Sequence, residues 1–171
     1  MRRTLLAALL AALVPAAALA AQNPWDAAKS VAGKSSTAQL EKEVNKRLLD
    51  EGRKNQCSFK SGTAELEKGC DTKSKNLAKA LIDAKKKLNT AGVQNFKFVV
   101  SGHTDSSGSA DKNKALSGER AQVMVKQLVA KGVPASEIES VGMGSEKPLV
   151  SPDDTPQKKA KNRRYEIQVR L

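Results

Sequence analysis

The segment VVSGHTDSSGSADKNKALSGERA, residues 99–121, changes from the periodicity of a strand to that of a helix. At its N-terminal side, residues 96–101 carry phenylalanine and valine at every second position, which is typical of a half-buried strand. A short polar loop at residues 106–110 follows, and the pattern then predicts a helix over residues 112–130. The predicted buried side of that helix consists of Ala121, Val125 and Leu128.

Two opposite charges lie on these elements, Asp105 just after the predicted strand and Arg120 within the predicted helix. Asp105 follows the end of the strand, where sheets that alternate with helices commonly receive ligands. Asn113, Ser117 and Arg120 share one face of the helix, because offsets of four and seven residues align side chains. An acid and a guanidinium together match a zwitterion, since the acid can hold an ammonium group and the guanidinium a carboxylate. The alternative is a surface ion pair, worth about 0–1 kcal/mol and without functional meaning.

Outside this segment, helices and strands continue to alternate, which indicates a sheet with helices packed on it. Ser36 and Gln39 have the spacing of a capping box at the start of a helix. Residues 145–162 contain three prolines and predict a loop with at most a short helix. The other expected elements are a helix at 36–52, a strand at 56–66 with a turn at Ser61-Gly62, a helix at 72–89, a strand at 138–141 and a strand at 165–171.

Five motifs occur in order between Gly102 and Ile167. They are Gly102-His103-Thr104-Asp105 with Gly108, Asn113-x-x-Leu116-Ser117-x-x-Arg120-Ala121, Gly132-Val133-Pro134, Gly142-Met143-Gly144 and Asn162-Arg163-Arg164-Tyr165-Glu166-Ile167. In these motifs residues 56–171 resemble the OmpA-like peptidoglycan-binding domain, the C-terminal module of many Gram-negative envelope proteins. The resemblance implies an α+β two-layer sandwich of βαβαββ order, with the helices packed on one mixed sheet.

The resemblance also implies a function, which is non-covalent binding of peptidoglycan through the meso-diaminopimelate of its stem peptide. In that family, the residues matching Asp105 and Arg120 grip the zwitterionic end of diaminopimelate. The residue matching Asn113 contributes polar contacts, and the one matching Leu116 lines the pocket. The matching ligand-binding residues of this chain are Asp105, Arg120, Asn113, Leu116, Thr104 and Arg164. The last two belong to motifs that lie close to the ligand. Catalysis, a metal ion and a cofactor are not expected.

The first 20 residues predict a secretory signal peptide, because Arg2 and Arg3 precede an apolar run that ends in Ala18-Leu19-Ala20. No later stretch reaches the roughly 20 apolar residues of a membrane-spanning helix. We therefore expect the mature chain in the periplasm, free or associated with the outer membrane or the cell wall. The expected parts are the signal peptide at 1–20, a linker with a short N-terminal helix at 21–55 and the OmpA-like domain at 56–171.

Cys57 and Cys70 are the only cysteines, and export would place them in an oxidising compartment. A disulfide that closes a loop of this size contributes roughly 3 kcal/mol in the chain-entropy model. Two free thiols or a metal pair are the alternatives, but the single histidine leaves a Cys/His metal site short of ligands. That histidine, His103, is predicted to lie on the strand or the pocket rim, because no nucleophile with a placed base accompanies it.

The formal net charge of +12 would draw the protein towards polyanions. Nucleic acid is not an expected partner, because aromatic residues make up only 3% of the chain and single strands need exposed rings for stacking. An adaptor is the alternative function, in which the helix at 36–52 would hold an outer-membrane or periplasmic protein while the domain binds the wall. A wall hydrolase is disfavoured, since the nucleophile and the metal ligands that it needs are missing.

Three further motifs have simple structural interpretations. Gly142 and Gly144 are predicted to form a turn. Asp153-Asp154 is predicted to be a solvated pair in a loop, because too few oxygen ligands are nearby for a metal site. Arg163-Arg164 is either plain surface charge or a contact with ligand carboxylates.

Overall fold

The computed structural model describes residues 24–60 and 62–171, with side chains from Ser36 onward. The signal peptide predicted for residues 1–20 therefore lies outside the described residues. The chain divides into two compact units after Ser36, and the larger unit, Thr37–Leu171, contains the sheet. None of the helices in the described part of the chain is long and apolar enough to cross a membrane.

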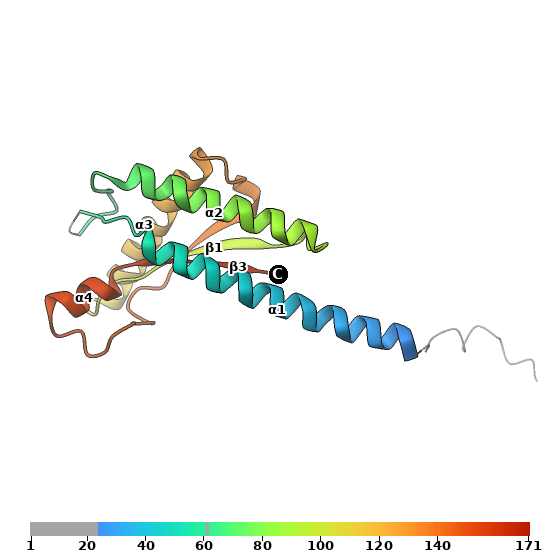
Figure 1. The fold of residues 1–171 in the computed structure, drawn as a ribbon. Coiled ribbons are helices and arrows are strands. Elements are labelled where there is room, and N and C mark those ends of the chain that lie inside the picture. The colour runs from blue at the N-terminus through green and yellow to red at the C-terminus, as the bar shows by residue number, and fades with distance from the viewer. Residues whose placement is uncertain (1–23, 61) are drawn as a thin grey trace, which may run out of the picture. The chain divides into compact units, whose positions relative to one another are not determined.

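Helices and strands alternate along this part of the chain (Figure 1). The helices are α1 (Pro24–Lys54), α2 (Cys70–Thr90), α3 (Ala110–Ala130) and α4 (Pro156–Asn162), with a 3-10 turn at Ala135–Glu137. The strands are β1 (Lys97–Gly102), β2 (Ile138–Gly142) and β3 (Tyr165–Arg170). They form a mixed sheet in the order β2-β1-β3. The predicted fold class, helices packed on one mixed sheet, is confirmed. The predicted βαβαββ order is wrong, because the strand expected before α2 is absent and the described elements run in the order ααβαβαβ.

β1 is the central strand, and it is buried more completely than the sequence predicts. It pairs in parallel with β2, with Phe98 opposite Ile138, and antiparallel with β3, with Phe98 opposite Val169. Phe98, Val99 and Val100 are at most 1% exposed, so the strand is buried on both faces rather than half-buried. A strand covered on both faces carries a continuous apolar run instead of strict alternation.

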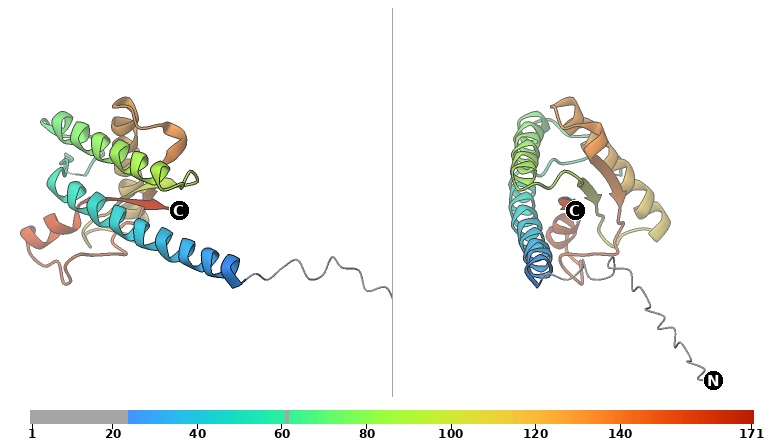
Figure 2. Two further views of the ribbon diagram at one scale, coloured as in Figure 1. Left: turned by 45° about the vertical axis from the view of Figure 1, so that its right-hand side comes forward. Right: turned by 90° about the vertical axis from the view of Figure 1, so that its right-hand side faces the viewer.

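The part of α1 from Thr37 onward and α2 run side by side along one side of the sheet (Figure 2). Two ion pairs connect them, Lys87 to Glu43 at 2.5 Å and Arg47 to Asp83 at 4.0 Å. Their buried side chains in the core are Val44, Leu48, Cys70, Leu77, Ala78, Leu81, Ala84 and Leu88. This face of the N-terminal helix is therefore docked on the domain.

α1 begins at Pro24 and is longer than the helix predicted for residues 36–52. The part predicted as a linker with a short helix, residues 21–55, is therefore helical from Pro24 to Lys54. Proline is favoured in the first turn of a helix, where its missing N–H would have no partner. The alanines and lysines that follow are strong helix formers. The capping-box spacing at Ser36 and Gln39 therefore lies inside the helix and does not mark its start.

The strand predicted for residues 56–66 does not form. This segment, which we call the 57–66 hairpin, instead folds back on itself with an isolated bridge between Phe59 and Leu66. The N–H of Lys60 donates to the carbonyl of Glu65 at 2.9 Å, so backbone groups of the segment are satisfied within the segment. A further strand in the sheet would need backbone hydrogen-bond partners on β3. Side chains of α1 and of the residue just before the hairpin already bond to those backbone groups.

Two side-chain amides occupy the outer edge of β3. Asn45 donates to the carbonyl of Val169 at 3.0 Å and accepts from its N–H at 2.6 Å. Gln56 donates to the carbonyl of Tyr165 at 2.8 Å and accepts from its N–H at 3.3 Å. Each amide provides the donor and the acceptor that a neighbouring strand would provide. Backbone pairing by residues 56–66 is therefore not required to satisfy these edge groups.

α3 lies so close to the ends of β1 and β2 that a Cβ atom would not fit at two glycines. A Cβ on Gly102 would lie 2.1 Å from the carbonyl oxygen of Ser117, and one on Gly142 would lie 2.5 Å from that of Lys114. The turn predicted for Gly142 and Gly144 belongs to Gly144, which has a φ of 53°, while Gly142 ends β2 and serves the close approach. This packing places the first half of α3 beside the loop after β1.

Cys57 and Cys70 form a disulfide with a Cα–Cα distance of 5.2 Å, as the sequence predicts. The bond joins the base of the 57–66 hairpin to the first residue of α2. Replacing both cysteines with serine is expected to lower the free energy of unfolding by up to about 3 kcal/mol, because the open chain gains entropy when it unfolds. Urea unfolding measures this difference, and equal midpoints for the variant and the oxidised parent would contradict the expectation.

Candidate functional site

A cavity of about 910 Å³ opens between the C-terminal end of β1, the first half of α3, the 57–66 hairpin and the residues that end and follow α4. This volume lies within the range of about 300–1,000 Å³ that is usual for small-molecule sites. The structure places all six predicted ligand-binding residues in the lining: Asp105, Arg120, Asn113, Leu116, Thr104 and Arg164. Segments far apart in the sequence therefore bring opposite charges to one cavity.

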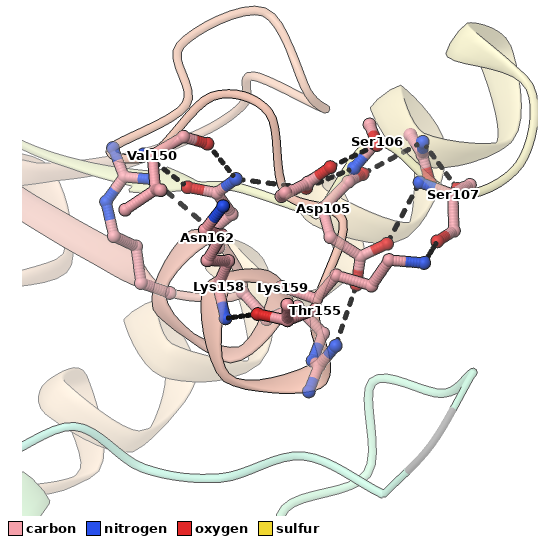
Figure 3. Close-up of polar contacts among 12 residues, drawn as sticks. Asp105, Ser106, Ser107, Val150, Thr155, Lys158, Lys159 and Asn162 are labelled. Carbon is pink, nitrogen blue, oxygen red and sulfur yellow. Dashed lines mark hydrogen bonds and ion pairs between the residues drawn. The ribbon is translucent and has the colours of Figure 1, made fainter.

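Asp105 lies just after β1 and is 9% exposed. Its Oδ1 accepts from the N–H of Ser107 at 3.0 Å (Figure 3), and its Oδ2 accepts from Nη1 of Arg163 at 2.8 Å. Burial acts to raise the pKa of this carboxyl group, but the hydrogen bonds from Arg163 and Ser107 outweigh it and lower the pKa. Asp105 is therefore ionised at neutral pH, and about half of the roughly four acceptor sites of a carboxylate remain open.

Arg120 reaches the same cavity from α3 and is 7% exposed. Its Nε donates to the carbonyl of Thr63 at 2.9 Å, and its guanidinium carbon lies 5.1 Å from the ring centroid of Phe59. Burial and then the charge of Arg163 lower the pKa of the guanidinium, while Asp105 acts to raise it. Among the described residues, the hydrogen bond of this side chain is made by Nε alone. The two terminal NH₂ groups thus keep donors for a ligand.

Asn113 holds the loop that carries Asp105. Its Nδ2 donates to the carbonyl of Ser107 at 2.9 Å and, more weakly, to that of Asp105 at 3.4 Å. Lys159 of α4 donates to the hydroxyl of Ser107 at 2.8 Å (Figure 3). The loop is thus fixed from α3 and from α4. The amide donors of Asn113, which the resemblance assigns to polar contacts with the ligand, are used here by the protein backbone.

Asn162, which is 1% exposed, connects the loop before α4 with the Asp105 loop (Figure 3). It accepts from the N–H of Val150 at 3.1 Å and donates to the carbonyl of Val150 at 2.9 Å and to Asp153 at 3.0 Å. Asp153 in turn accepts from the N–H of Ser106 at 2.9 Å and from its hydroxyl. The prediction of a solvated Asp153 is wrong, since the residue is 8% exposed. The hydrogen bonds from Ser106 and then Asn162 lower its pKa to about 2.

Arg164 and Thr104 line the cavity but differ in what they can offer a ligand. The guanidinium of Arg164 is used internally, because Nε donates to Glu166 at 2.7 Å and Nη2 to the carbonyl of Lys147 at 3.1 Å. Thr104 is 5% exposed, and its hydroxyl has no hydrogen-bond partner within the described part of the chain. Leu116 is half-buried and adds an apolar surface to the lining.

His103 also lines the cavity, and it is a buried, uncharged group. It follows β1, is 2% exposed and has no hydrogen bond from either ring nitrogen to a described residue. Its Nε2 lies 3.8 Å from Oε2 of Glu166. Burial and then the charge of Arg164 lower the pKa of the imidazole to about 4, although Glu166 acts to raise it. His103 is therefore neutral at physiological pH.

Three residues that the sequence analysis does not assign to the site contribute directly to it. Arg163 is the ion-pair partner of Asp105, whereas the sequence leaves it undecided between surface charge and a ligand contact. Phe59 and Thr63 of the hairpin hold Arg120. Phe59 is a conspicuous aromatic residue in the sequence. Its place beside the site could not be predicted, because it depends on a hairpin in a segment where the sequence pattern predicts a strand.

Residues 58–163 match the model of the OmpA family. The chain belongs to the OmpA family. Peptidoglycan-binding protein ArfA of Mycobacterium tuberculosis is 44% identical over 73 residues, which are 43% of this chain and 22% of that protein. Probable lipoprotein YiaD of Escherichia coli is 44% identical over 68 residues, 40% of this chain and 31% of the relative. The peptidoglycan-associated lipoprotein of Pseudomonas aeruginosa is 38% identical over 71 residues, 42% of each chain. The match thus spans less than half the length of each of these relatives.

Solved structures show the OmpA-like fold for about two thirds of the chain. The peptidoglycan-associated lipoprotein of Burkholderia pseudomallei superposes with a TM-score of 0.55 at 22% identity, covering 67% of this chain and 89% of that one. The C-terminal domain of Helicobacter pylori MotB gives a TM-score of 0.55 at 23% identity, covering 68% and 84%. The resemblance stated from the five motifs is confirmed at the level of family and fold.

The OmpA family is non-enzymatic. Within residues 24–60 and 62–171, no cluster of three or more His, Cys, Asp or Glu side chains could hold a metal ion. What the cavity offers is two buried opposite charges with open hydrogen-bonding capacity, beside apolar walls. Such an arrangement can bind a small zwitterion.

Proposed function

We propose that this chain binds peptidoglycan non-covalently and holds the zwitterionic end of meso-diaminopimelate between Asp105 and Arg120. We call this pair of residues the clamp. The observation that carries the proposal is that both residues are less than a tenth exposed and line one cavity. ArfA and the peptidoglycan-associated lipoprotein, whose names state peptidoglycan binding or association, support the class of ligand.

The chemistry of the clamp fits the free end of diaminopimelate group by group. The ammonium would donate to the open acceptor sites of Asp105. The carboxylate would accept two parallel hydrogen bonds from the terminal NH₂ groups of Arg120, an arrangement that is strong and geometrically specific. The methylene chain would lie against Leu116 and Phe59, which line the same cavity, and each buried CH₂ contributes about 0.8 kcal/mol.

The residues around the clamp would act as positioning residues. Arg163 and Asn113 fix Asp105 through the ion pair and the loop contacts. Thr63 and Phe59 fix Arg120. These contacts hold the two charged groups in place before a ligand arrives, which reduces the ordering that binding would otherwise cost.

Isothermal titration with two soluble tripeptides tests this function. One is L-alanyl-γ-D-glutamyl-meso-diaminopimelate, and the other has L-lysine as its third residue. The lysine peptide offers an ammonium to Asp105 but no distal carboxylate to Arg120. We expect the diaminopimelate peptide to bind roughly 10- to 100-fold more tightly, because hydrogen bonds to charged groups contribute about 1.5–3 kcal/mol. Equal affinities for the two peptides, or binding of neither, would refute the clamp.

The affinity for the diaminopimelate peptide is expected to be constant between pH 5 and pH 8. The pKa of Asp105 is lowered from 3.8, so the carboxylate stays charged over this range, and binding falls only when the pH drops below that ordinary value. His103, with its pKa lowered to about 4, stays neutral throughout. Titrations at half-unit intervals measure the profile. An inflection near pH 6.5 would contradict the assignment of a neutral, non-titrating His103.

We also propose that the protein acts in the periplasm, where its ligand is found. Outer membrane protein A of Klebsiella pneumoniae, 51% identical over 51 residues, supports a place in the cell envelope. Fractionation of cells expressing the full chain tests this location, and recovery in the cytoplasmic fraction alone would argue against it. The adaptor alternative remains a prediction, and it would require a surface of α1 other than the docked Val44–Leu48 face.

A further inference from the structure

The cavity carries more positive charge than a zwitterion needs. Its cationic lining residues are Arg53, Arg120, Lys161, Arg163 and Arg164, and its acidic ones are Glu67 and Asp105. The lining therefore has three more positive than negative charges. The free end of diaminopimelate has one charge of each sign and would leave this excess unchanged. A ligand with additional negative charge would fit the cavity better.

Three of the five cations already have a contact or a role. Arg163 pairs with Asp105 at 2.8 Å, Arg164 pairs with Glu166 at 2.7 Å, and Arg120 belongs to the clamp. Arg53 and Lys161 remain, and both are exposed. The side chain of neither residue forms a hydrogen bond or an ion pair with another described residue. Two positive charges at the cavity are thus open to a partner outside the protein.

Arg53 and Lys161 come from distant parts of the sequence. Arg53 lies in the last turn of α1 and Lys161 in the last turn of α4. A cation at a helix C-terminus is favourable by about 0.3–1 kcal/mol because of the helix dipole, which accounts for each residue separately. The dipole does not account for the convergence of both on one cavity. We call these two residues the rim pair.

We propose that the rim pair binds a second carboxylate of the ligand, that of the γ-linked D-glutamate that precedes diaminopimelate in the stem peptide. This inference rests on the proposed function. With the free end of diaminopimelate in the clamp, the glutamate that precedes it would extend away from the clamp, and the exposed rim pair lies in the lining of the same cavity. Its free carboxylate can accept charge-assisted hydrogen bonds from a guanidinium and an ammonium. When that carboxylate is amidated, the ionic attraction is lost, so the site selects the unamidated stem peptide.

The test compares the affinity of the protein for L-alanyl-γ-D-glutamyl-meso-diaminopimelate and for the same peptide with the glutamate carboxylate amidated. The parent is expected to bind the free acid roughly 3- to 10-fold more tightly, because each exposed ion pair contributes about 0.2–1 kcal/mol. The double variant Arg53→Gln/Lys161→Gln is expected to bind both peptides equally. The matched control Lys46→Gln/Lys79→Gln removes the same charge from exposed positions outside the cavity lining and is expected to keep the preference.

Equal binding of the two peptides by the parent would overturn the rim pair as a carboxylate site. A preference that survives in the Arg53→Gln/Lys161→Gln variant, or disappears equally in the control, would also overturn it. The clamp is judged by a different comparison, that between the diaminopimelate and lysine peptides. If the protein discriminates those two but not the acid from the amide, the rim pair fails and the clamp stands. If neither diaminopimelate peptide binds, both proposals fail.

Discussion

Arg120→Met is expected to reduce the affinity of the protein for purified sacculi roughly 10- to 100-fold, because a buried charged hydrogen bond is worth about 1.5–3 kcal/mol. Methionine keeps an unbranched apolar side chain beside Phe59 but removes the guanidinium that would hold the ligand carboxylate. Asp105→Asn is expected to act similarly, since it keeps the size of the side chain and removes its charge. Co-sedimentation with sacculi over a range of protein concentrations measures both effects.

Arg47→Met is the matched control for this experiment. Arg47 lies on α1 with its side chain 64% exposed, and it does not line the cavity, so its loss should leave binding unchanged. Urea unfolding of all variants separates a lost ligand contact from a lost fold. Titration adds a sharper readout, because Arg120→Met should bind the diaminopimelate and lysine tripeptides alike. If Arg120→Met and Asp105→Asn sediment like the parent while folded, the clamp is wrong.

Gly102→Ala is expected to destabilise the protein by about 3 kcal/mol or more, at the upper end of the usual effect of overpacking a core. The new Cβ would lie 2.1 Å from the carbonyl oxygen and 2.9 Å from the carbonyl carbon of Ser117, both of which are backbone atoms of α3. Relief would require α3 to move away from β1. That shift would also separate Arg120 from the Asp105 loop, so sacculus binding should fall together with stability.

Gly52→Ala is the control for this second substitution. Gly52 lies within α1, and a Cβ there would meet no atom within 4 Å. The change is expected to stabilise the helix by up to about 1 kcal/mol, since alanine is the better helix former. Chemical unfolding of both variants therefore should give shifts of opposite sign. A Gly102→Ala protein as stable as the parent would disprove the close contact between α3 and β1.

Elements whose apolar residues recur with a single clear period could be predicted from the sequence. The last strand is predicted at 165–171 and found at Tyr165–Arg170, because its apolar and polar residues alternate and only one face is buried. The helix predicted at 112–130 is found at Ala110–Ala130 for the same reason, with a period of 3.6. In both cases burial of one face decides the local structure.

The strand predicted at 56–66 could not be corrected from the sequence, because strand formation depends on an available partner. The groups of β3 that such a strand would use are bonded to Asn45 and Gln56, and no local pattern shows this long-range pairing. For the site, the motifs identify which residues line the cavity. They do not identify which side chains pair, and the partner of Asp105 proves to be Arg163, whose position depends on how the chain turns after α4.

The two amides on β3 have a consequence for how copies of this protein behave towards one another. A bare strand edge attracts strands of other molecules and promotes aggregation. Here an incoming strand would have to displace Asn45 and Gln56 from Val169 and Tyr165 before it could add to the sheet. α1 therefore protects the open edge of β3 from pairing with other molecules, and it also covers the core. A fragment that lacked this helix would lose Asn45 and would expose the edge of β3 to other molecules of the protein.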